Sequence, residues 1–188
     1  MDATAPRSGT RSRLWPLVLT AGVLAVVVLG GYPLGDALSR PAGPPVDVAG
    51  VVRVRPLTGW ETAGRFDELP GARLTRGSGN LDVVALPFQG TADDLAREYV
   101  SQVLEPHADR LSVSSSVEPV TVGAGLPGAR VAYVGTFGKS QSPIEGEVTA
   151  VVSPSGAGVV FDAWSPQGLL RYVVDDMRTM IDRAEVAG

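Results

Sequence analysis

The chain has 188 residues and a formal net charge of −4, with a single histidine and no cysteine. The lack of cysteine excludes disulfides, thiolate nucleophiles and cysteine-ligated metals. Residues 41–188 hold 12 basic and 18 acidic residues, so this part of the chain carries a formal charge of −6. Such an acidic surface argues against a nucleic-acid partner, because that affinity comes largely from cations that neutralise phosphates.

The basic residues are almost all arginine, and Lys139 is the only lysine. Glycine, alanine and valine are abundant. We interpret this usage as that of a GC-rich bacterium such as an actinobacterium, which is an inference about codons and says nothing of function.

An apolar segment near the N-terminus predicts a membrane anchor. Residues 14–32 comprise 19 residues, about 28 Å of helix, which nearly matches a hydrocarbon core of about 30 Å. Leu17–Gly31 contains no charged residue, and Arg7, Arg11 and Arg13 precede it. The positive-inside rule then keeps the N-terminus in the cytoplasm. We expect a cytoplasmic tail over 1–13, a single transmembrane helix over 14–32 and an extracytoplasmic remainder.

A cleaved signal peptide is the competing interpretation, since residues 37–39 (Ala-Leu-Ser) loosely fit a processing site. The apolar segment is longer than the usual signal core of about 7–15 residues, and the possible site lies beyond its end, which favours retention. A Pro/Gly-rich tether is expected over 33–50, because several prolines there disfavour regular structure.

A single folded domain is expected over 51–188. The pattern predicts a strand at 51–55 and a hairpin of strands 72–76 and 81–86 around the turn 77–80. A helix follows, with Thr91 as its cap, acidic residues in its first turn and an end near Pro106. Further strands are expected at 111–117, 129–137, 144–152 and 159–164, with a turn at 123–128.

A second helix is expected to start at Ser165-Pro166, since a capping serine followed by proline is typical of helix N-termini. Its apolar stripe consists of Leu170, Val173, Val174, Met177, Ile181 and Ala184, and removing this helix should unfold the domain. The order of elements predicts an α+β fold with a mostly antiparallel sheet of about six to seven strands and two helices.

Three features resemble one known family. They are the opening VRVRPLTGW, the hairpin before an amphipathic helix, and the strand VVFDAWSP before the closing helix. Over residues 51–186 they resemble the PsbP-like sandwich, found in extrinsic photosystem II proteins, a eukaryotic Ran-release factor and exported actinobacterial proteins of the cell envelope. The resemblance implies a binding or accessory subunit without a shared catalytic motif.

Few residues point to catalysis. His107, the only histidine, follows Pro106 near a helix C-terminus, where a cation interacts favourably with the helix dipole. Glu145 and Glu147 share one face of a strand, with Asp162 as a possible neighbour, but Ca²⁺ needs six to eight oxygens. We therefore expect no metal, no cofactor and no catalytic residue.

Large aromatic side chains are the more suggestive candidates for a binding site. Such rings favour partly buried sites, and we predict that they line an apolar crevice between sheet and helix. These tentative ligand-binding residues are Trp60, Trp164, Tyr133, Phe137 and Phe161.

The leading hypothesis is therefore a membrane-anchored, extracytoplasmic and non-catalytic domain of the cell envelope that recognises a protein partner or an apolar ligand. One alternative is a carboxylate-dependent hydrolase of envelope glycans that uses Glu145, Glu147 or Asp162, which requires two carboxyls about 5–9.5 Å apart across a cleft. Another is a purely structural subunit of a membrane complex.

Overall fold

The structure is a computed structural model that describes residues 41–66, 69–138 and 142–188. The predicted tail, the predicted anchor and most of the predicted tether lie outside these residues. Within the described part of the chain, no helix is long and apolar enough to cross a membrane.

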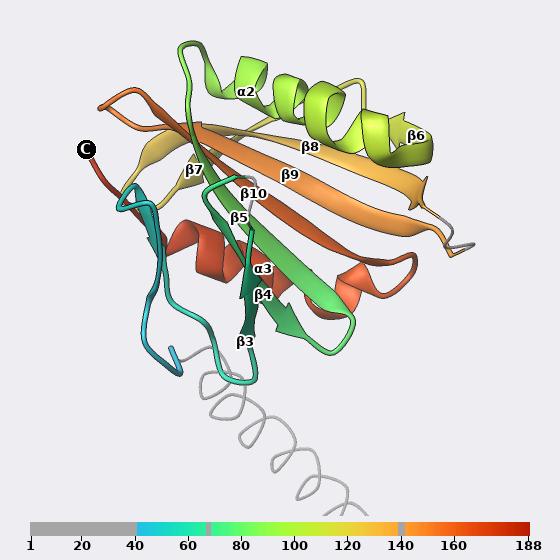
Figure 1. Cartoon of the computed structure of the whole chain (residues 1–188), viewed down its shortest axis with the longest axis horizontal. Helices are drawn as coiled ribbons and strands as arrows, with labels where there is room; N and C mark the ends of the chain where they lie inside the picture. The colour runs from blue at the N-terminus through green and yellow to red at the C-terminus, as the bar shows by residue number, and fades with distance from the viewer. Residues whose placement is uncertain (1–40, 67–68, 139–141) are drawn as a thin grey trace, which may run out of the picture. The chain divides into compact units, whose positions relative to one another are not determined.

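The domain is built on an eight-stranded sheet in which all neighbours pair antiparallel. In spatial order its strands are β3 (Glu61–Arg65), β4 (Gly71–Arg76), β5 (Gly79–Pro87), β10 (Ala157–Pro166), β9 (Ile144–Val152), β8 (Leu126–Phe137) and β6 (Ala108–Val113), with β7 (Glu118–Val122) also paired to β8. The strands β5 and β10 lie side by side at its centre (Figure 1).

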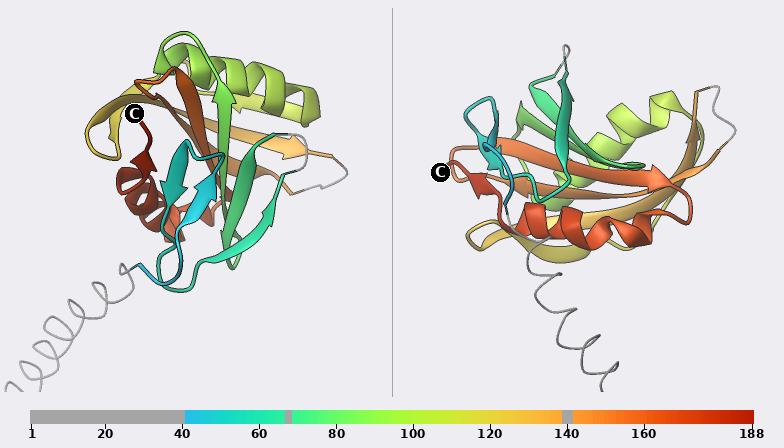
Figure 2. Two further views of the ribbon diagram at one scale, coloured as in Figure 1. Left: turned by 60° about the vertical axis from the view of Figure 1, so that its left-hand side comes forward. Right: turned by 90° about the horizontal axis from the view of Figure 1, so that it is seen from below.

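One face of the sheet is covered by the helix α2 (Ala92–Tyr99), which continues as a π turn (Val100–Leu104) and a 3₁₀ turn (Glu105–His107). This helix contacts β8, β9 and β10. The opposite face carries α3 (Val174–Asp182), preceded by a 3₁₀ turn (Leu170–Tyr172), as the right-hand view in Figure 2 shows.

A small three-stranded sheet lies on the α3 side of the domain. It consists of β1 (Val46–Val48), β2 (Val52–Val54) and β11 (Glu185–Val186), all antiparallel. The valines of β1 and β2 join the same apolar core as α3, so this sheet extends the layer that α3 begins.

Alternation along β10 divides the interior into two cores. Val159, Phe161 and Ala163 belong to the core on the α3 side, whereas Val160 belongs to the core beneath α2. Successive side chains of a strand point to opposite faces, so an almost wholly apolar strand must be covered on both sides.

Sequence patterning predicted several elements correctly. The strand Ile144–Val152 has the predicted bounds, and α2 begins after Thr91, whose Oγ1 accepts a hydrogen bond from the Asp94 N–H at 3.1 Å. Asp94 in turn accepts from the Thr91 N–H at 3.0 Å, which completes a capping box. The α+β class and the mainly antiparallel sheet are confirmed.

The start of the second helix was predicted wrongly. Ser165 and Pro166 continue β10, paired with Glu145 and Ile144 of β9, and α3 begins only at Val174. Sheet pairing therefore outweighs the local cap-and-proline signal, and Pro166, as the last residue of β10, removes a single N–H donor from the sheet. The predicted apolar stripe is nevertheless confirmed, with Met177, Ile181 and Ala184 among its buried members.

The described residues also hold eleven strands, more than the six to seven predicted. The structure begins earlier than the predicted boundary at Val51, because Val46–Val48 lies within 33–50 and pairs with β2. The short strands β3, β7 and β11 escaped prediction because exposed or polar residues occupy most of their positions. Part of the predicted turn 123–128 belongs to β8, which begins at Leu126.

We expect α3 to contribute much of the stability of the domain. Ile181 is only 1% exposed in the α3 core, so Ile181→Ala should lower the free energy of unfolding by about 2–5 kcal/mol, as cavity-forming substitutions do. The matched control Asp182→Ala changes the exposed neighbour and should cost under about 0.5 kcal/mol. Urea unfolding followed by circular dichroism checks this, and equal effects of the two changes would contradict it.

Candidate functional site

Two carboxyl groups lie in the middle of the large sheet. Asp82 of β5 and Asp162 of β10 are direct partners across the central strand pair, and they are 6% and 3% exposed. A buried carboxylate is costly unless donors surround it. The side chains that supply these donors define the candidate site.

Asp162 is held by two tyrosines. The Tyr133 hydroxyl of β8 donates to Oδ1 at 2.7 Å, and the Tyr99 hydroxyl of α2 donates to Oδ2 at 3.3 Å. Burial raises the pKa of Asp162 to about 7, an effect that the two hydroxyl donors partly oppose and the nearby Asp82 reinforces. Burial and the charge of Asp162 also raise the pKa of both tyrosines.

A glycine makes room for the Tyr133 ring. Gly146 of β9 is the direct partner of Tyr133 in the sheet, and a Cβ atom added there would lie 2.5 Å from Tyr133 Cζ. Any side chain at position 146 would clash with this ring. Because glycine has none, the ring lies across β9 and reaches β10. The glycine thus positions the hydroxyl that holds Asp162.

Asp82 accepts three hydrogen bonds. The Arg73 guanidinium of β4 donates from Nε to Oδ1 at 2.5 Å and from Nη2 to Oδ2 at 2.7 Å, and Trp164 Nε1 donates to Oδ2 at 3.1 Å. The guanidinium carbon also lies 5.2 Å from the Trp164 ring centroid and 5.5 Å from that of Phe66. A two-pronged ion pair with aromatic rings beside it holds Arg73 in one orientation.

A recess opens beside this cluster. The helix α2 contacts β8, β9 and β10. The recess lies over β4 and β5, beside the C-terminal end of this helix, and has a volume of about 480 Å³. This volume is within the range of small-molecule sites. The recess is lined by Arg65, Phe66, Leu69, Arg73, Asp82, Val84, Tyr99 and Val103.

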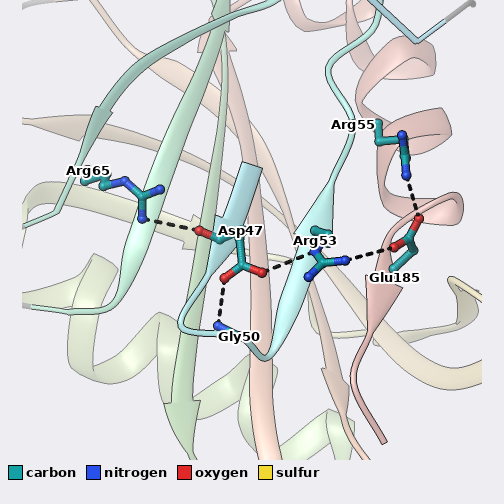
Figure 3. Close-up of polar contacts among 6 residues, drawn as sticks. All are labelled: Asp47, Gly50, Arg53, Arg55, Arg65 and Glu185. Carbon is teal, nitrogen blue, oxygen red and sulfur yellow. Dashed lines mark hydrogen bonds and ion pairs between the residues drawn. The ribbon is translucent and has the colours of Figure 1, made fainter. Parts of the chain in front are cut away.

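Arg65, at the end of β3, bonds to the small sheet beside a network of charged side chains (Figure 3). Its Nη1 donates to the Asp47 carbonyl oxygen at 3.3 Å. The Asp47 carboxylate accepts from the Gly50 N–H at 2.8 Å and from Arg53 Nε at 3.2 Å, and these bonds lower its pKa. Glu185 of β11 joins the network through Arg53 and Arg55. These exposed pairs are individually weak, and the Arg65 guanidinium lies with them on the small sheet, on the α3 side.

A second hollow of about 650 Å³ lies at the other end of α2, between its first turn and the hairpin of β7 and β8. Its charged side chains, Asp93 and Arg97, form an ordinary ion pair one helical turn apart, at 3.2 Å. Asp93 Oδ1 is buried there without a hydrogen-bond partner, but the hollow lacks the cluster of hydrogen-bonded carboxyl, tyrosine and arginine side chains beside the first recess, which is therefore the better candidate site.

The three carboxylates considered for catalysis do not meet. Glu147 pairs with Arg178 of α3 at 2.5 Å, and Glu145 accepts from the Gly168 and Leu170 N–H groups at 2.8 and 3.1 Å. Both face the α3 side, whereas Asp162 bonds to Tyr99 of α2 on the other side. The face of β9 that carries Glu147 is covered in part by α3, through the ion pair with Arg178.

The predicted position of His107 near a helix end is confirmed. Its Nδ1 lies 2.8 Å from the Val103 carbonyl oxygen in the last turn that follows α2. A ring nitrogen bonded there satisfies one of the carbonyls that a helix end leaves without a partner, which accounts for this residue structurally.

The five predicted aromatic residues are divided between the two faces of the sheet. Trp60 and Phe161 lie in the core on the α3 side, where Trp60 Nε1 donates to Asp176 at 3.3 Å. Tyr133, Phe137 and Trp164 lie on the α2 side. They form no single crevice. Trp164 contacts two lining residues of the recess, Asp82 and Arg73. A ligand-binding role for the five residues stays a prediction.

Arg73 and Asp82, the polar centre of the site, were missed by the sequence analysis. A signal for the carboxyl existed, because Asp82 interrupts an apolar strand. It stands between Leu81 and Val83, as Asp162 stands between Phe161 and Ala163. A carboxyl in a fully buried strand requires donors and so marks a place where polar groups from other elements converge.

The sheet, covered by α2 on one face and by α3 on the other, defines an α+β domain with the PsbP-like fold, as predicted. No known family model and no curated protein matches the sequence. Solved structures do match in fold, and 26 chains are similar.

One similar structure is cyanobacterial PsbP from Synechocystis, with a TM-score of 0.56 and 14% identity over 77% of this chain and 92% of that one. Another is LpqN of Mycobacterium tuberculosis, which is involved in cell envelope biogenesis (TM-score 0.54, 11% identity, 78% and 86% covered). A third is the Ran-binding protein Mog1p of Saccharomyces cerevisiae (TM-score 0.55, 12% identity, 78% and 96% covered). At such identities the likeness concerns the fold.

The Asp162 environment predicts a pH-dependent stability. Because burial raises the pKa of Asp162 from 3.8 to about 7, the folded chain binds this proton more tightly than the unfolded chain. Its stabilising effect is fully present below about pH 4 and is lost as the pH rises through about 7. Relative to the unmodified chain, Asp162→Asn should therefore gain up to about 1.4 kcal/mol of unfolding free energy per pH unit between pH 5 and 7.

The matched control is Asp109→Asn, at an exposed position of β6. Chemical unfolding at several pH values measures the difference between each variant and the unmodified chain. A difference for Asp162→Asn that is as independent of pH as that of the control would contradict the expected ionisation.

Proposed function

We propose that this chain is a non-catalytic binding or accessory domain of the cell envelope, held at the outer side of the membrane by residues 14–32. Its recognition site is the recess beside α2. The observation that carries this proposal is the combination of an open recess of about 480 Å³ with a buried, hydrogen-bonded polar cluster at its base. A core that served only as structural filling would gain little from such a cluster.

The similar structures support a role in binding. Mog1p is a Ran-binding protein, and LpqN is involved in cell envelope biogenesis. The support is analogy at the level of the fold, and function belongs to sites on a fold. We therefore rest the proposal on the recess and take the envelope location from the sequence.

The hydrogen bonds and ion pairs of the carboxylates favour a non-catalytic role. Glu145 holds the backbone before α3, and Glu147 forms an ion pair with Arg178. Asp82 already accepts three hydrogen bonds. Groups engaged in this way serve the architecture, which leaves little support for a hydrolase with two free carboxylates across a cleft.

The proposed topology is open to a labelling experiment, because the natural chain has no cysteine. Ser115→Cys, at an exposed position, should react with a membrane-impermeant maleimide in intact cells. Ser8→Cys, in the predicted cytoplasmic tail, should react only after lysis and should remain attached to the labelled chain. Labelling of both variants in intact cells would contradict the topology. If the mature Ser8→Cys chain takes up no label even after lysis, the N-terminal segment has been cleaved off.

The role of the recess is open to site-specific crosslinking in intact cells. A photoreactive residue in place of Leu69, which lines the recess and is 40% exposed, should capture a defined molecule. The same residue in place of Val113, also 40% exposed but on β6, is the matched control. Adding Val103→Trp, which fills the recess, should abolish the Leu69-specific product. Identical products at both positions, or products unaffected by Val103→Trp, would overturn the proposed site.

A further inference from the structure

We propose that the recess binds an amphipathic organic anion, with its acidic group at Arg73 and its apolar body against Phe66, Leu69 and Val103. The inference rests on the proposed function of the recess as a binding site and specifies the class of ligand.

Charge is the first argument. Arg73 and Asp82 are the charged lining residues whose side chains meet on the α2 side of the sheet. Arg65 pairs in β3 and β4 with Ala72, which faces the α3 core, and its guanidinium bonds to Asp47 of the small sheet. The sign of the ligand therefore depends on which charge of the Arg73–Asp82 pair a ligand can reach.

The accessibility of these charges strengthens the argument. The Asp82 side chain is 8% exposed and accepts bonds on both oxygens, whereas the Arg73 side chain is 37% exposed. Arg73 uses Nε and Nη2 for Asp82, and a guanidinium has five N–H donors. A ligand in the recess therefore meets donors of Arg73 more readily than the acceptors of Asp82.

The Arg73 side chain is also held in one orientation before any ligand binds. Its plane is fixed by the two bonds to Asp82 and by the rings of Phe66 and Trp164, at 5.5 and 5.2 Å. Binding of a ligand then costs little side-chain entropy. Loss of this entropy is otherwise the main cost of using a long cationic side chain.

The other buried carboxyl does not oppose an anion directly. Asp162 is 3% exposed and is not among the lining residues. The Tyr99 side chain, which does line the recess, donates its hydroxyl to Asp162. Tyr99 thus separates Asp162 from the recess.

Apolar surface supplies the second half of the site. Phe66, Val84 and Val103 contribute hydrocarbon to the lining, and Leu69 is 40% exposed at the recess. Covering such surface is favourable in proportion to its area. A free inorganic anion would leave this apolar surface exposed to water, so an acid with an apolar body fits the recess better.

Equilibrium dialysis of the full chain in nanodiscs of zwitterionic lipid tests the ligand class, with empty nanodiscs as the blank. Three probes share one apolar body: 4-phenylbutyrate, 4-phenylbutan-1-ol and 4-phenylbutylammonium. The acid should bind at least about fivefold more tightly than the alcohol, as expected for one charge-assisted contact, and the ammonium most weakly.

Variants of the same chain locate the contact. Arg73→Gln, with its melting temperature measured to establish that it folds, should weaken the acid about fivefold and leave the alcohol unchanged. Arg55→Gln, an exposed arginine that does not line the recess, should change neither. Val103→Trp should weaken all three probes, with its melting temperature measured to establish that it folds.

The outcomes separate the two proposals. Equal affinity of the three probes, lost in a folded Val103→Trp variant, would overturn the anion proposal and leave the recess as a binding site. Binding of all three that is unaffected by Val103→Trp, or no binding at about 1 mM of any probe, would overturn both. Loss of acid binding with a folded Arg73→Gln variant that still binds the alcohol, and not with Arg55→Gln, supports the proposal.

Discussion

Two carboxyl groups opposite each other in the central strand pair constrain much of this domain. Asp82 and Asp162 lie where the sheet is buried on both faces, and a carboxyl there is tolerated only with donors around it. Asp82 takes them from β4 and β10, and Asp162 from β8 and α2. The need to satisfy two side chains thus ties three further elements to the centre of the sheet.

The same constraint explains why a recess forms beside α2. Tyr99, the last residue of α2, bonds to Asp162, and the chain then widens into a π turn from Val100. At the start of the helix, Gly158 allows Phe88 and Leu95 to lie close to β10, since a Cβ atom there would be 2.8 Å from Phe88 Cβ. The helix is therefore held over β8, β9 and β10, and part of β4 and β5 stays open. Short π segments often accompany functional sites.

Much of the fold was predictable because local signals and tertiary structure agree. The capping box of Thr91, the alternation in Ile144–Val152 and the apolar stripe of α3 all survive in the structure. Prediction failed where tertiary pairing decides: Pro166 extends β10 against Ile144, and Val46–Val48 becomes a strand because β2 lies beside it. The exposed strand β3 carries no apolar alternation from which it could have been predicted.

The site was only partly within reach of the sequence. Arg73 and Asp82 are direct partners in the hairpin of β4 and β5, so a two-residue turn at Gly77-Ser78 would have placed them together. A four-residue turn was assumed, and the pair was missed. The convergence of Tyr99, Tyr133 and Trp164 on the two carboxyls depends on how distant elements pack, which no local pattern encodes.

The measurement that tests this account most directly is a crystal structure of the chain with 4-phenylbutyrate. The account predicts the carboxylate within hydrogen-bond distance of the Arg73 guanidinium, the Arg73–Asp82 ion pair unbroken, and the phenyl ring against Phe66 and Val103. A ligand bound elsewhere on the domain, with the recess closed or filled by water, would contradict it.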